Sequence, residues 1–148
     1  MRVVIYKIPQ QEKVLYNLGK LLEKIFKNHQ IGVLCNESNI EFVDKTLWTF
    51  SSDVFIPHDI DCNDETENKK NPILLSCDLN KIVRDVLCVF TLEDLEKILS
   101  DEFNFKNNIN TLIYITQEEN DVLKIKHSTN CNVDVFVKNK NKWEKTIM

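Results

Sequence analysis

Residues 59–64, which read DIDCND, bring together carboxylates that could hold a cation. The alternation resembles the start of an EF-hand calcium loop. Asp64 stands where that loop needs its turn glycine, however, and Lys70 stands where it needs a bidentate glutamate. Asp59 and Asp61 could instead form a two-metal carboxylate pair, but no recognisable third carboxylate or phosphate-holding set accompanies them. We therefore interpret this segment as a solvated acidic loop and expect no metal.

Nucleophilic and phosphate-transfer chemistry lack their usual motifs in this chain. The three histidines, His29, His58 and His127, accompany no G-x-S-x-G elbow. The two glycines, Gly19 and Gly32, lie too far apart for a Walker A or dinucleotide-binding loop. The five cysteines include no C-x-x-C pair, so no zinc knuckle is indicated, and we expect reduced thiols in a cytoplasmic protein. The residues predict neither catalysis nor a cofactor; the alternative is a small Rossmann-like enzyme with a cryptic active site.

Charge is distributed unevenly along the chain, which carries a net charge of −4. Residues 1–121 have a net charge of −8, whereas residues 122–148 have a net charge of +4 and also contain Phe136 and Trp143. A local basic and apolar surface on an acidic protein suits an acidic peptide with hydrophobic side chains better than a long DNA backbone. Alternatively, these lysines only keep an edge strand soluble. We expect direct DNA binding to be weak, because six lysines offer few phosphate contacts.

The strands that must position these residues are indicated by short apolar runs. The length of 148 residues predicts one domain over 1–148. Runs rich in β-branched residues predict buried parallel strands, and an alternating segment predicts an antiparallel edge strand. The parallel strands are expected at 3–8, 31–35, 73–76, 86–90 and 111–116, and the antiparallel one at 133–138.

Helices are indicated between these strands. An apolar stripe at helical spacing covers 11–28, and two pairs three residues apart, Ser38 with Glu41 and Thr91 with Asp94, predict further helix starts. Residues 117–128 could form a short helix. The predicted fold class is α/β: a single Rossmann-like domain, mostly parallel sheet with helices on both faces and an antiparallel C-terminal edge strand. No stretch approaches the roughly 18 consecutive apolar residues of a membrane helix, so we expect no membrane partner.

One segment of the chain resembles a known family. Residues 47–58 read LWTFSSDVFIPH. Phe55 stands seven positions after Trp48 and is followed by Pro57 and His58 in the pattern Phe-x-Pro-His. The chi subunit of bacterial DNA polymerase III has a Leu-Trp pair at the end of its second helix, followed by Phe-x-Pro-His at this spacing. The stretches VLCN, PILL and VFVKNKNKWEK also resemble that family, so that the resemblance covers roughly residues 6–145.

The resemblance implies a Rossmann-like, non-catalytic accessory subunit of the DNA polymerase III holoenzyme. Such a subunit associates with the clamp loader through the psi subunit, and it links the replisome to the acidic tail of single-stranded-DNA-binding protein during DNA replication. DNA-directed DNA polymerase activity would belong only to the assembly. The resemblance places Trp48, Phe55, Pro57 and His58 on or beside the clamp-loader surface, although Trp48 and Phe55 could instead be core residues.

A site for the acidic tail of single-stranded-DNA-binding protein needs cations beside an apolar patch. We expect Lys124, Lys126 and His127 to attract it, because they lie in the basic C-terminal segment and in the region that corresponds to the family's last helix. That helix is shorter here, since only 16 residues separate Thr116 from Val133. A shallow basic groove near residues 122–143 is expected of an adaptor, and a deep pocket with perturbed carboxylates is expected of an enzyme.

Overall fold

The computed structural model describes residues 2–50, 55–61, 71–100, 109–128, 132–139 and 142–146; the side chains of His127 and Ser128 fall outside that description. Of the acidic segment 59–64, only the first three residues are among those described. The positions of Asp64 and Lys70, on which the comparison with an EF-hand loop depends, therefore lie outside the described residues.

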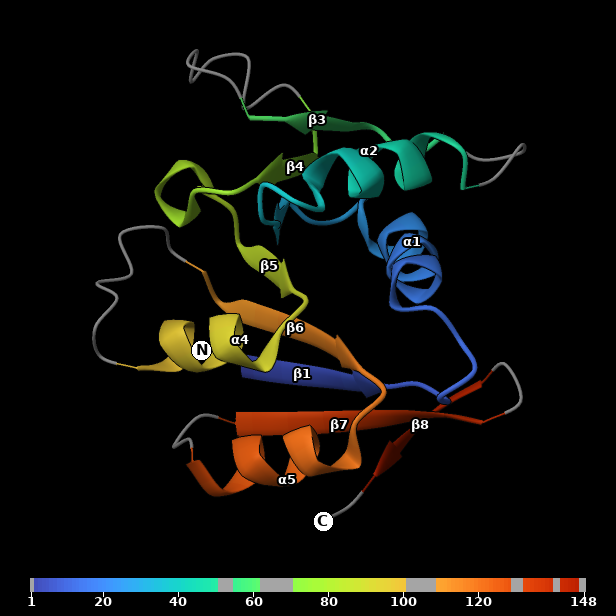
Figure 1. Ribbon diagram of the computed structural model, residues 1–148, viewed down its shortest axis with the longest axis vertical. Helices are drawn as coiled ribbons and strands as arrows, with labels where there is room; N and C mark the ends of the chain where they lie inside the picture. Colours follow the sequence, from blue (N-terminus) through green and yellow to red (C-terminus); the bar gives the residue numbers. More distant parts are fainter. Residues whose placement is uncertain are drawn as a thin grey trace.

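Eight strands form one sheet in the order β3-β4-β2-β5-β6-β1-β7-β8 (Figure 1). Every neighbouring pair is parallel except the last, in which β8 runs antiparallel to β7. The five predicted parallel strands are confirmed to within one residue at each end. The strands are β1 (Arg2–Lys7), β2 (Ile31–Leu34), β3 (His58–Ile60), β4 (Ile73–Ser76), β5 (Val86–Val89), β6 (Thr111–Thr116), β7 (Asn132–Asn139) and β8 (Lys142–Thr146).

The predicted antiparallel C-terminal edge and the strand at 133–138 are both confirmed, but this strand is not the edge strand. β7 lies inside the sheet and pairs in parallel with β1, with Phe136 opposite Tyr6. The antiparallel edge strand is β8, in which Trp143 lies opposite Lys138. Alternating polar and apolar residues indicate a strand with one covered face, but they carry no information on the direction of its neighbour.

Side-chain hydrogen bonds to backbone N–H groups lie at or just before the start of two helices. The predicted cap of α4 is confirmed, because Thr91 Oγ1 accepts a hydrogen bond of 3.1 Å from the Asp94 N–H. The predicted Ser38–Glu41 capping box is replaced: Asn36 Oδ1 accepts from the N–H groups of Ser38 and Asn39 before α2 begins. The helices are α1 (Val14–Ile25), α2 (Ile40–Trp48), α4 (Leu92–Leu99) and α5 (Glu119–Ser128), with a 3₁₀ turn η1 at Leu79–Lys81.

The helices cover both faces of the sheet, as predicted (Figure 1). One apolar layer includes Leu18 of α1, Val43 of α2 and Val4 of β1. The other includes Leu95 of α4 and Val122 of α5, together with the residues that flank Val4 in the strand. Successive side chains of a strand point to opposite faces, so one buried strand contributes to both layers. In the described part of the chain, no helix is long and apolar enough to cross a membrane.

Candidate partner-binding surfaces

Two aromatic side chains stand out from the surface at the end of α2. Trp48 is the last residue of that helix and is 53% exposed, and Phe55, in the segment that leads to β3, is 62% exposed. Their ring centroids lie 5.3 Å apart. Burying large aromatic rings releases considerable free energy, so an exposed pair of this kind is a typical binding hot spot. The alternative that Trp48 and Phe55 are core residues is wrong.

The segment 55–58 alternates between solvent and core. Phe55 is exposed, Ile56 is buried, Pro57 is half-buried and His58 is buried again, which is the two-residue period of an extended chain. Ile56 belongs to the apolar layer under α1 and α2. The buried residue between them therefore holds Phe55 and Pro57 at the surface.

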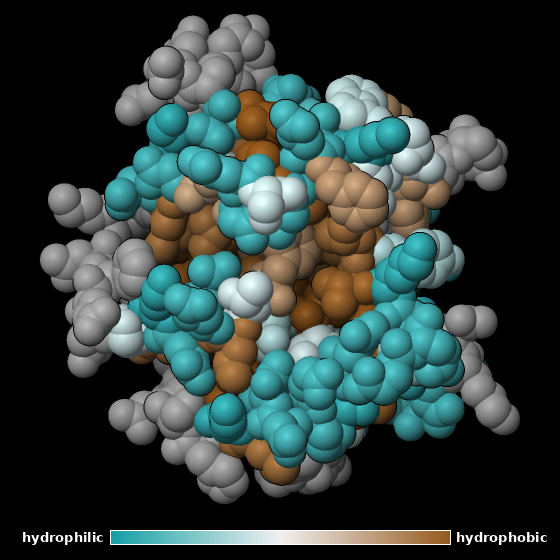
Figure 2. Space-filling view, viewed as in Figure 1, coloured by the Kyte–Doolittle hydropathy of each residue, from teal (hydrophilic) through white to brown (hydrophobic). Residues whose placement is uncertain are grey.

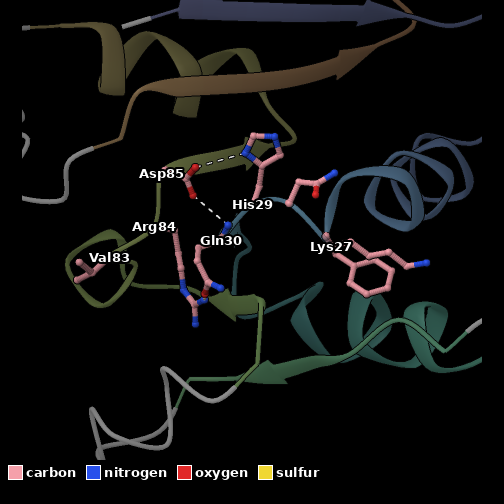
Figure 3. A pocket seen from close by; sticks show the side chains of 8 residues that line it. Lys27, His29, Gln30, Val83, Arg84 and Asp85 are labelled. Atoms are coloured by element: carbon pink, nitrogen blue, oxygen red, sulfur yellow. Dashed lines mark hydrogen bonds and ion pairs between the residues drawn. The ribbon is translucent and has the colours of Figure 1, made fainter.

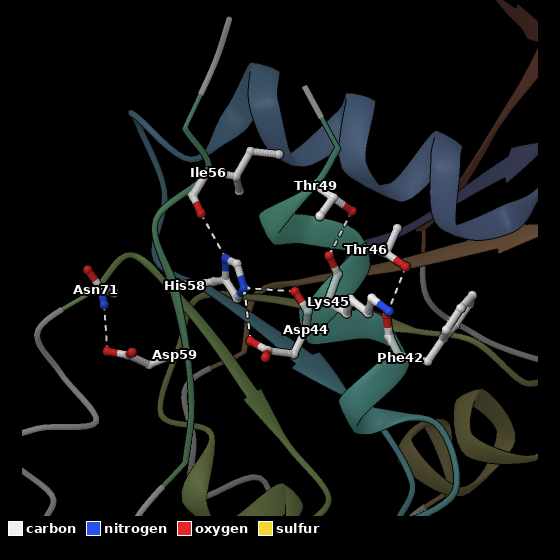
Figure 4. Close-up of polar contacts among 9 residues, drawn as sticks. All are labelled: Phe42, Asp44, Lys45, Thr46, Thr49, Ile56, His58, Asp59 and Asn71. Carbon is white, nitrogen blue, oxygen red and sulfur yellow. Dashed lines mark hydrogen bonds and ion pairs between the residues drawn. The ribbon is translucent and has the colours of Figure 1, made fainter. Parts of the chain in front are cut away.

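The His58 side chain links this segment to α2 through polar contacts with Asp44 (Figure 4). Its Nδ1 atom lies 2.7 Å from the Ile56 carbonyl oxygen, and its Nε2 atom lies 3.0 Å from Asp44 Oδ1 and 3.2 Å from the Asp44 carbonyl oxygen. The Trp48 ring packs on the imidazole with centroids 4.7 Å apart. The predicted set is thus brought together, with His58 as the buried support and Trp48 and Phe55 as the surface that a partner can contact.

The second predicted set lies on α5, which covers the other face of the sheet. Val122 and Ile125 are buried in the layer that α5 shares with α4, whereas Leu123 and Lys124 are exposed and Lys126 is half-buried. The side chain of His127 lies outside the described residues. Since α2 and α5 pack on opposite faces, the structure does not bring the two predicted sets together, and each would need its own partner contact.

The positive charge of the C-terminal segment is partly neutralised within the fold. Lys138 lies 2.6 Å from the carboxylate of Glu12, and this contact lowers the pKa of that carboxyl group below its usual range. Arg2 and Lys145 flank Asp134 at 2.7 Å and 3.3 Å, and their hydrogen bonds lower the pKa of Asp134. Asp134 is already counted in the sequence sum of +4, so the contact that draws on a negative charge outside the segment is the one between Lys138 and Glu12, and it offsets one positive charge. The lowered pKa values of Glu12 and Asp134 are both explained by these ion pairs, so neither marks a catalytic pocket.

The two aspartates of the acidic segment have protein partners. Asn71 donates a hydrogen bond of 2.5 Å to Asp59, and Lys81 lies 3.1 Å from Asp61. Within the part of the chain that the structure describes, no cluster of three or more histidine, cysteine or acidic side chains could hold a metal ion. The described geometry thus gives these carboxylates structural roles.

A cavity of about 550 Å³ opens at the amino ends of β2 and β5 (Figure 3). His29 lies 3.4 Å from Asp85, whose carboxylate also accepts a hydrogen bond of 3.0 Å from the Gln30 N–H. The buried guanidinium of Arg84 donates to the Gln30 side chain and to the Pro72 carbonyl oxygen, and burial lowers its pKa. Ligand sites of open α/β sheets lie at the carboxyl ends of strands, so this cavity is at the wrong end for a typical active site.

The sequence interpretation overlooked an apolar and basic surface on α1 and α2. Figure 2 shows mainly hydrophilic side chains over β7 and β8, and apolar side chains gathered in the middle of the same face, beside α1. Phe42 of α2 and Tyr16 of α1 are 63% and 46% exposed. The available signal in the sequence was the spacing of Lys20 and Lys24 on one face of α1, with Lys13 and Lys27 in its flanks.

Comparison with known proteins matches most of the chain to a family model. The family model of the DNA polymerase III chi subunit, HolC, matches residues 1–127 of the 148. The matched range contains Trp48, Phe55, Pro57 and His58 as well as Lys124 and Lys126, and it ends before β7. No protein among the curated sequences matches the chain significantly.

Proposed function

The chain belongs to the family of the DNA polymerase III chi subunit, and from this premise we propose that it joins the clamp-loader complex to the acidic tail of single-stranded-DNA-binding protein. Chi subunits are accessory subunits of the polymerase III holoenzyme. The observation that carries the proposal is the exposed Trp48–Phe55 pair, held by a buried histidine at the motif that the family match includes.

The Trp48–Phe55 surface is the proposed site for the psi subunit or another clamp-loader component. Two adjacent exposed rings offer a large apolar contact area, and Pro57 stiffens the chain beside them. Because His58 and Ile56 anchor the intervening backbone, the rings are positioned before the partner arrives. Preorganisation of this kind reduces the entropy lost on binding.

The tail site is proposed on α5. Lys124 supplies an exposed cation, Lys126 lies two residues further on, and the exposed Leu123 supplies apolar area. His127 completes the proposed set as its predicted third cation. Exposed lysines at the rim would mainly set the association rate and its salt dependence, while the tail's buried hydrophobic side chain would set the dissociation rate. We expect affinity on the order of micromolar, which weakens as salt rises.

The clamp-loader contact is tested by replacing Trp48 and Phe55 together with alanine. Binding of the purified psi subunit, measured by calorimetry, should weaken at least about tenfold, since hot-spot truncations exceed 1–2 kcal/mol. Val83→Ala is the matched control, because Val83 is also an exposed apolar residue. Unchanged psi affinity in the double variant would move the clamp-loader contact elsewhere on the molecule.

The tail contact is tested with a labelled peptide of the single-stranded-DNA-binding protein tail. Lys124→Glu with Lys126→Glu should reduce its affinity at least several-fold in an anisotropy titration. Lys45→Glu with Lys97→Glu makes the same change of net charge at exposed lysines outside the proposed sites and is the matched control. If both variants bound the peptide equally weakly, the effect would come from overall charge and not from the α5 site. If the α5 variant kept its full affinity, the α5 site would be excluded.

The proposal includes the absence of catalysis by the chain alone and a place in the cytoplasm. Primer extension by the purified chain, in the absence of other polymerase subunits, would contradict it. A pull-down from lysate, probed for single-stranded-DNA-binding protein and clamp-loader subunits, tests the adaptor role as a whole.

A further inference from the structure

An apolar groove of about 700 Å³ lies between the amino-terminal half of α1 and α2. Tyr16 and Phe42 stand at its two sides, and Phe50 packs against Tyr16 with ring centroids 5.7 Å apart. The groove is distinct from the Trp48–Phe55 pair, neither of whose residues lines it. The lining residues are Lys13, Val14, Leu15, Tyr16, Phe42, Thr46, Thr49, Phe50 and Gln117.

The uncharged polar side chains of this groove already form hydrogen bonds with nearby backbone groups. The Thr46 hydroxyl donates to the Phe42 carbonyl oxygen at 2.7 Å, and the Thr49 hydroxyl donates to the Lys45 carbonyl oxygen at 2.9 Å. The Gln117 amide donates to the carbonyl oxygens of Gln10 and Glu12. With these donors occupied, the groove offers an incoming molecule mainly methyl groups and aromatic rings.

A stripe of lysines extends from the groove along α1. Lys13, Lys20, Lys24 and Lys27 follow one another at intervals of seven, four and three residues. Lys20 and Lys24 share one face of α1, Lys13 is its N-cap residue, and Lys27 follows its C-cap. All four are exposed, and none forms an ion pair within the described residues. Glu23, which is half-buried, is the only acidic residue between positions 13 and 28. This face is strongly basic although the chain is acidic overall.

The start of α1 adds further positive potential. Its N-cap residue is Lys13, which makes no capping hydrogen bond, and its first turn contains no acidic residue. A cation at the positive end of the helix dipole is unfavourable for the isolated fold, and a carboxylate supplied from outside would relieve it. The groove thus opens beside a region that favours a negatively charged group.

The Tyr16 ring of the groove is poorly placed for stacking on a nucleic-acid base. Lys20 Nζ lies over the Tyr16 ring at 5.4 Å, and Phe50 packs against the same ring. Base stacking needs a free aromatic face, whereas an aliphatic or aromatic side chain can fill a concave apolar groove. The surface therefore suits a peptide better than a single-stranded nucleic acid.

We propose that the α1–α2 groove and the lysine stripe together bind an acidic amphipathic segment of a partner protein. An aliphatic or aromatic side chain of that segment fills the groove beside Tyr16 and Phe42, and its carboxylates lie along Lys20, Lys24 and Lys27. This site is independent of the proposed contacts at Trp48–Phe55 and on α5.

The probe is a fluorescein-labelled peptide of about 14 residues, which spans about 21 Å as a helix and presents glutamates on one face and leucines on the other. The comparison probes are a polyglutamate peptide and an oligodeoxythymidylate, each of similar length. The amphipathic peptide should bind saturably to the full chain, and it should shift the backbone amide NMR signals of α1 and α2. Polyglutamate should bind at least several-fold more weakly, because it cannot fill the groove.

Two kinds of variant test the two halves of the surface. Lys20→Glu with Lys24→Glu, and separately Phe42→Ser, should each weaken the amphipathic peptide at least several-fold. The matched controls are Lys97→Glu with Lys142→Glu and Val83→Ser, which change exposed residues outside the proposed sites. Thermal melts establish that each variant is folded, and Lys20→Gln with Lys24→Gln replaces the charge reversal if the latter does not fold.

Several results would overturn the proposal. Binding of polyglutamate as tight as that of the amphipathic peptide would overturn it, and so would groove variants that keep full affinity for the amphipathic peptide. Tighter binding of the oligonucleotide to the same residues would identify a nucleic-acid surface. A dimer in sedimentation experiments that Phe42→Ser converts to a monomer would show that a second copy of the chain fills the groove.

Discussion

The ammonium group of Lys138 lies 2.6 Å from a carboxylate oxygen of Glu12, although the two residues are 126 positions apart. Lys138 also donates to the Asn17 side-chain oxygen at 3.1 Å, and its side chain is only 8% exposed. The contact joins β7 to the segment before α1. It withdraws one of the C-terminal lysines from the surface and ties two distant parts of the chain together.

This ion pair predicts a loss of stability in acid. Hydrogen bonding to Lys138 lowers the pKa of Glu12 in the folded state below its ordinary value of 4.5. Its contribution to stability is therefore present above pH 4.5 and is lost as the pH falls through the folded-state pKa. Glu12→Gln should lower the free energy of unfolding at pH 7 and flatten its decline in acid, as measured by urea titration. Glu96→Gln on α4 is the control. If stability declined in acid as steeply in the Glu12 variant as in the unsubstituted protein, the Glu12–Lys138 pair would not be the cause of the decline.

Removal of the His58 ring should destabilise the fold and disturb the aromatic pair. His58 is buried, and it contacts the Ile56 carbonyl oxygen and Asp44. His58→Ala leaves these acceptors without a partner and opens a cavity, so we expect a loss of about 2–4 kcal/mol. Urea unfolding measures the loss, and Trp48 fluorescence should shift because its ring packs on the imidazole. A fully stable variant with unchanged emission would show that His58 does not support this surface.

Gly32 is expected to tolerate no larger side chain. A Cβ atom at this position of β2 would lie 2.1 Å from Ile82 Cγ2, within a layer that is closely packed. Gly32→Ala should destabilise the protein by about 1–3 kcal/mol, as overpacking does. Combining it with Ile82→Ala should be less damaging than the sum of the single changes, because the second change removes the clash. Simple additivity in thermal unfolding would argue against the contact.

Cysteine reactivity should divide according to burial. Burial raises the pKa of Cys35 and of Cys88 to about 12, so almost no thiolate forms at pH 8. The Cys77 thiol is exposed and its pKa is also raised, which predicts slow but measurable alkylation. Peptide mapping after iodoacetamide treatment should find Cys77 modified in the native protein, and Cys35 and Cys88 modified only in urea. Rapid native labelling of Cys88 would contradict its buried position.

A substitution at the N-cap of α1 should change the stability of the fold and the affinity for the peptide in opposite directions. Lys13 has an extended backbone there with φ of −88° and ψ of 136°, which suits a capping serine. Lys13→Ser should stabilise the protein by about 1 kcal/mol, because serine can accept a hydrogen bond from the first turn. The same change should weaken the acidic amphipathic peptide, since it removes a cation from the groove. Thermal unfolding and anisotropy measure the two effects, and a variant that gains stability and keeps full peptide affinity would exclude Lys13 from the site.

The sequence by itself determined most of the strands and helices, because that information is local, but it did not indicate the short strands β3 and β8. A short apolar run rich in β-branched residues, such as 111–116, favours a buried strand. The hydrogen bond from the Asp94 N–H to the Thr91 hydroxyl caps the start of its helix and does not depend on what the helix packs against. The spacing of Trp48, Phe55, Pro57 and His58 likewise sufficed to indicate the family that the comparison then established.

Tertiary structure alone decided which strands are neighbours and which charges remain available. The alternation in β7 is the same beside a parallel as beside an antiparallel strand, so only assembly of the sheet places it next to β1. Local sequence does not reveal that Lys138 meets Glu12, or that Trp48 lies outside the core while His58 lies inside it. Burial and ion pairing depend on residues far apart in the chain, and these meet only when the layers pack together.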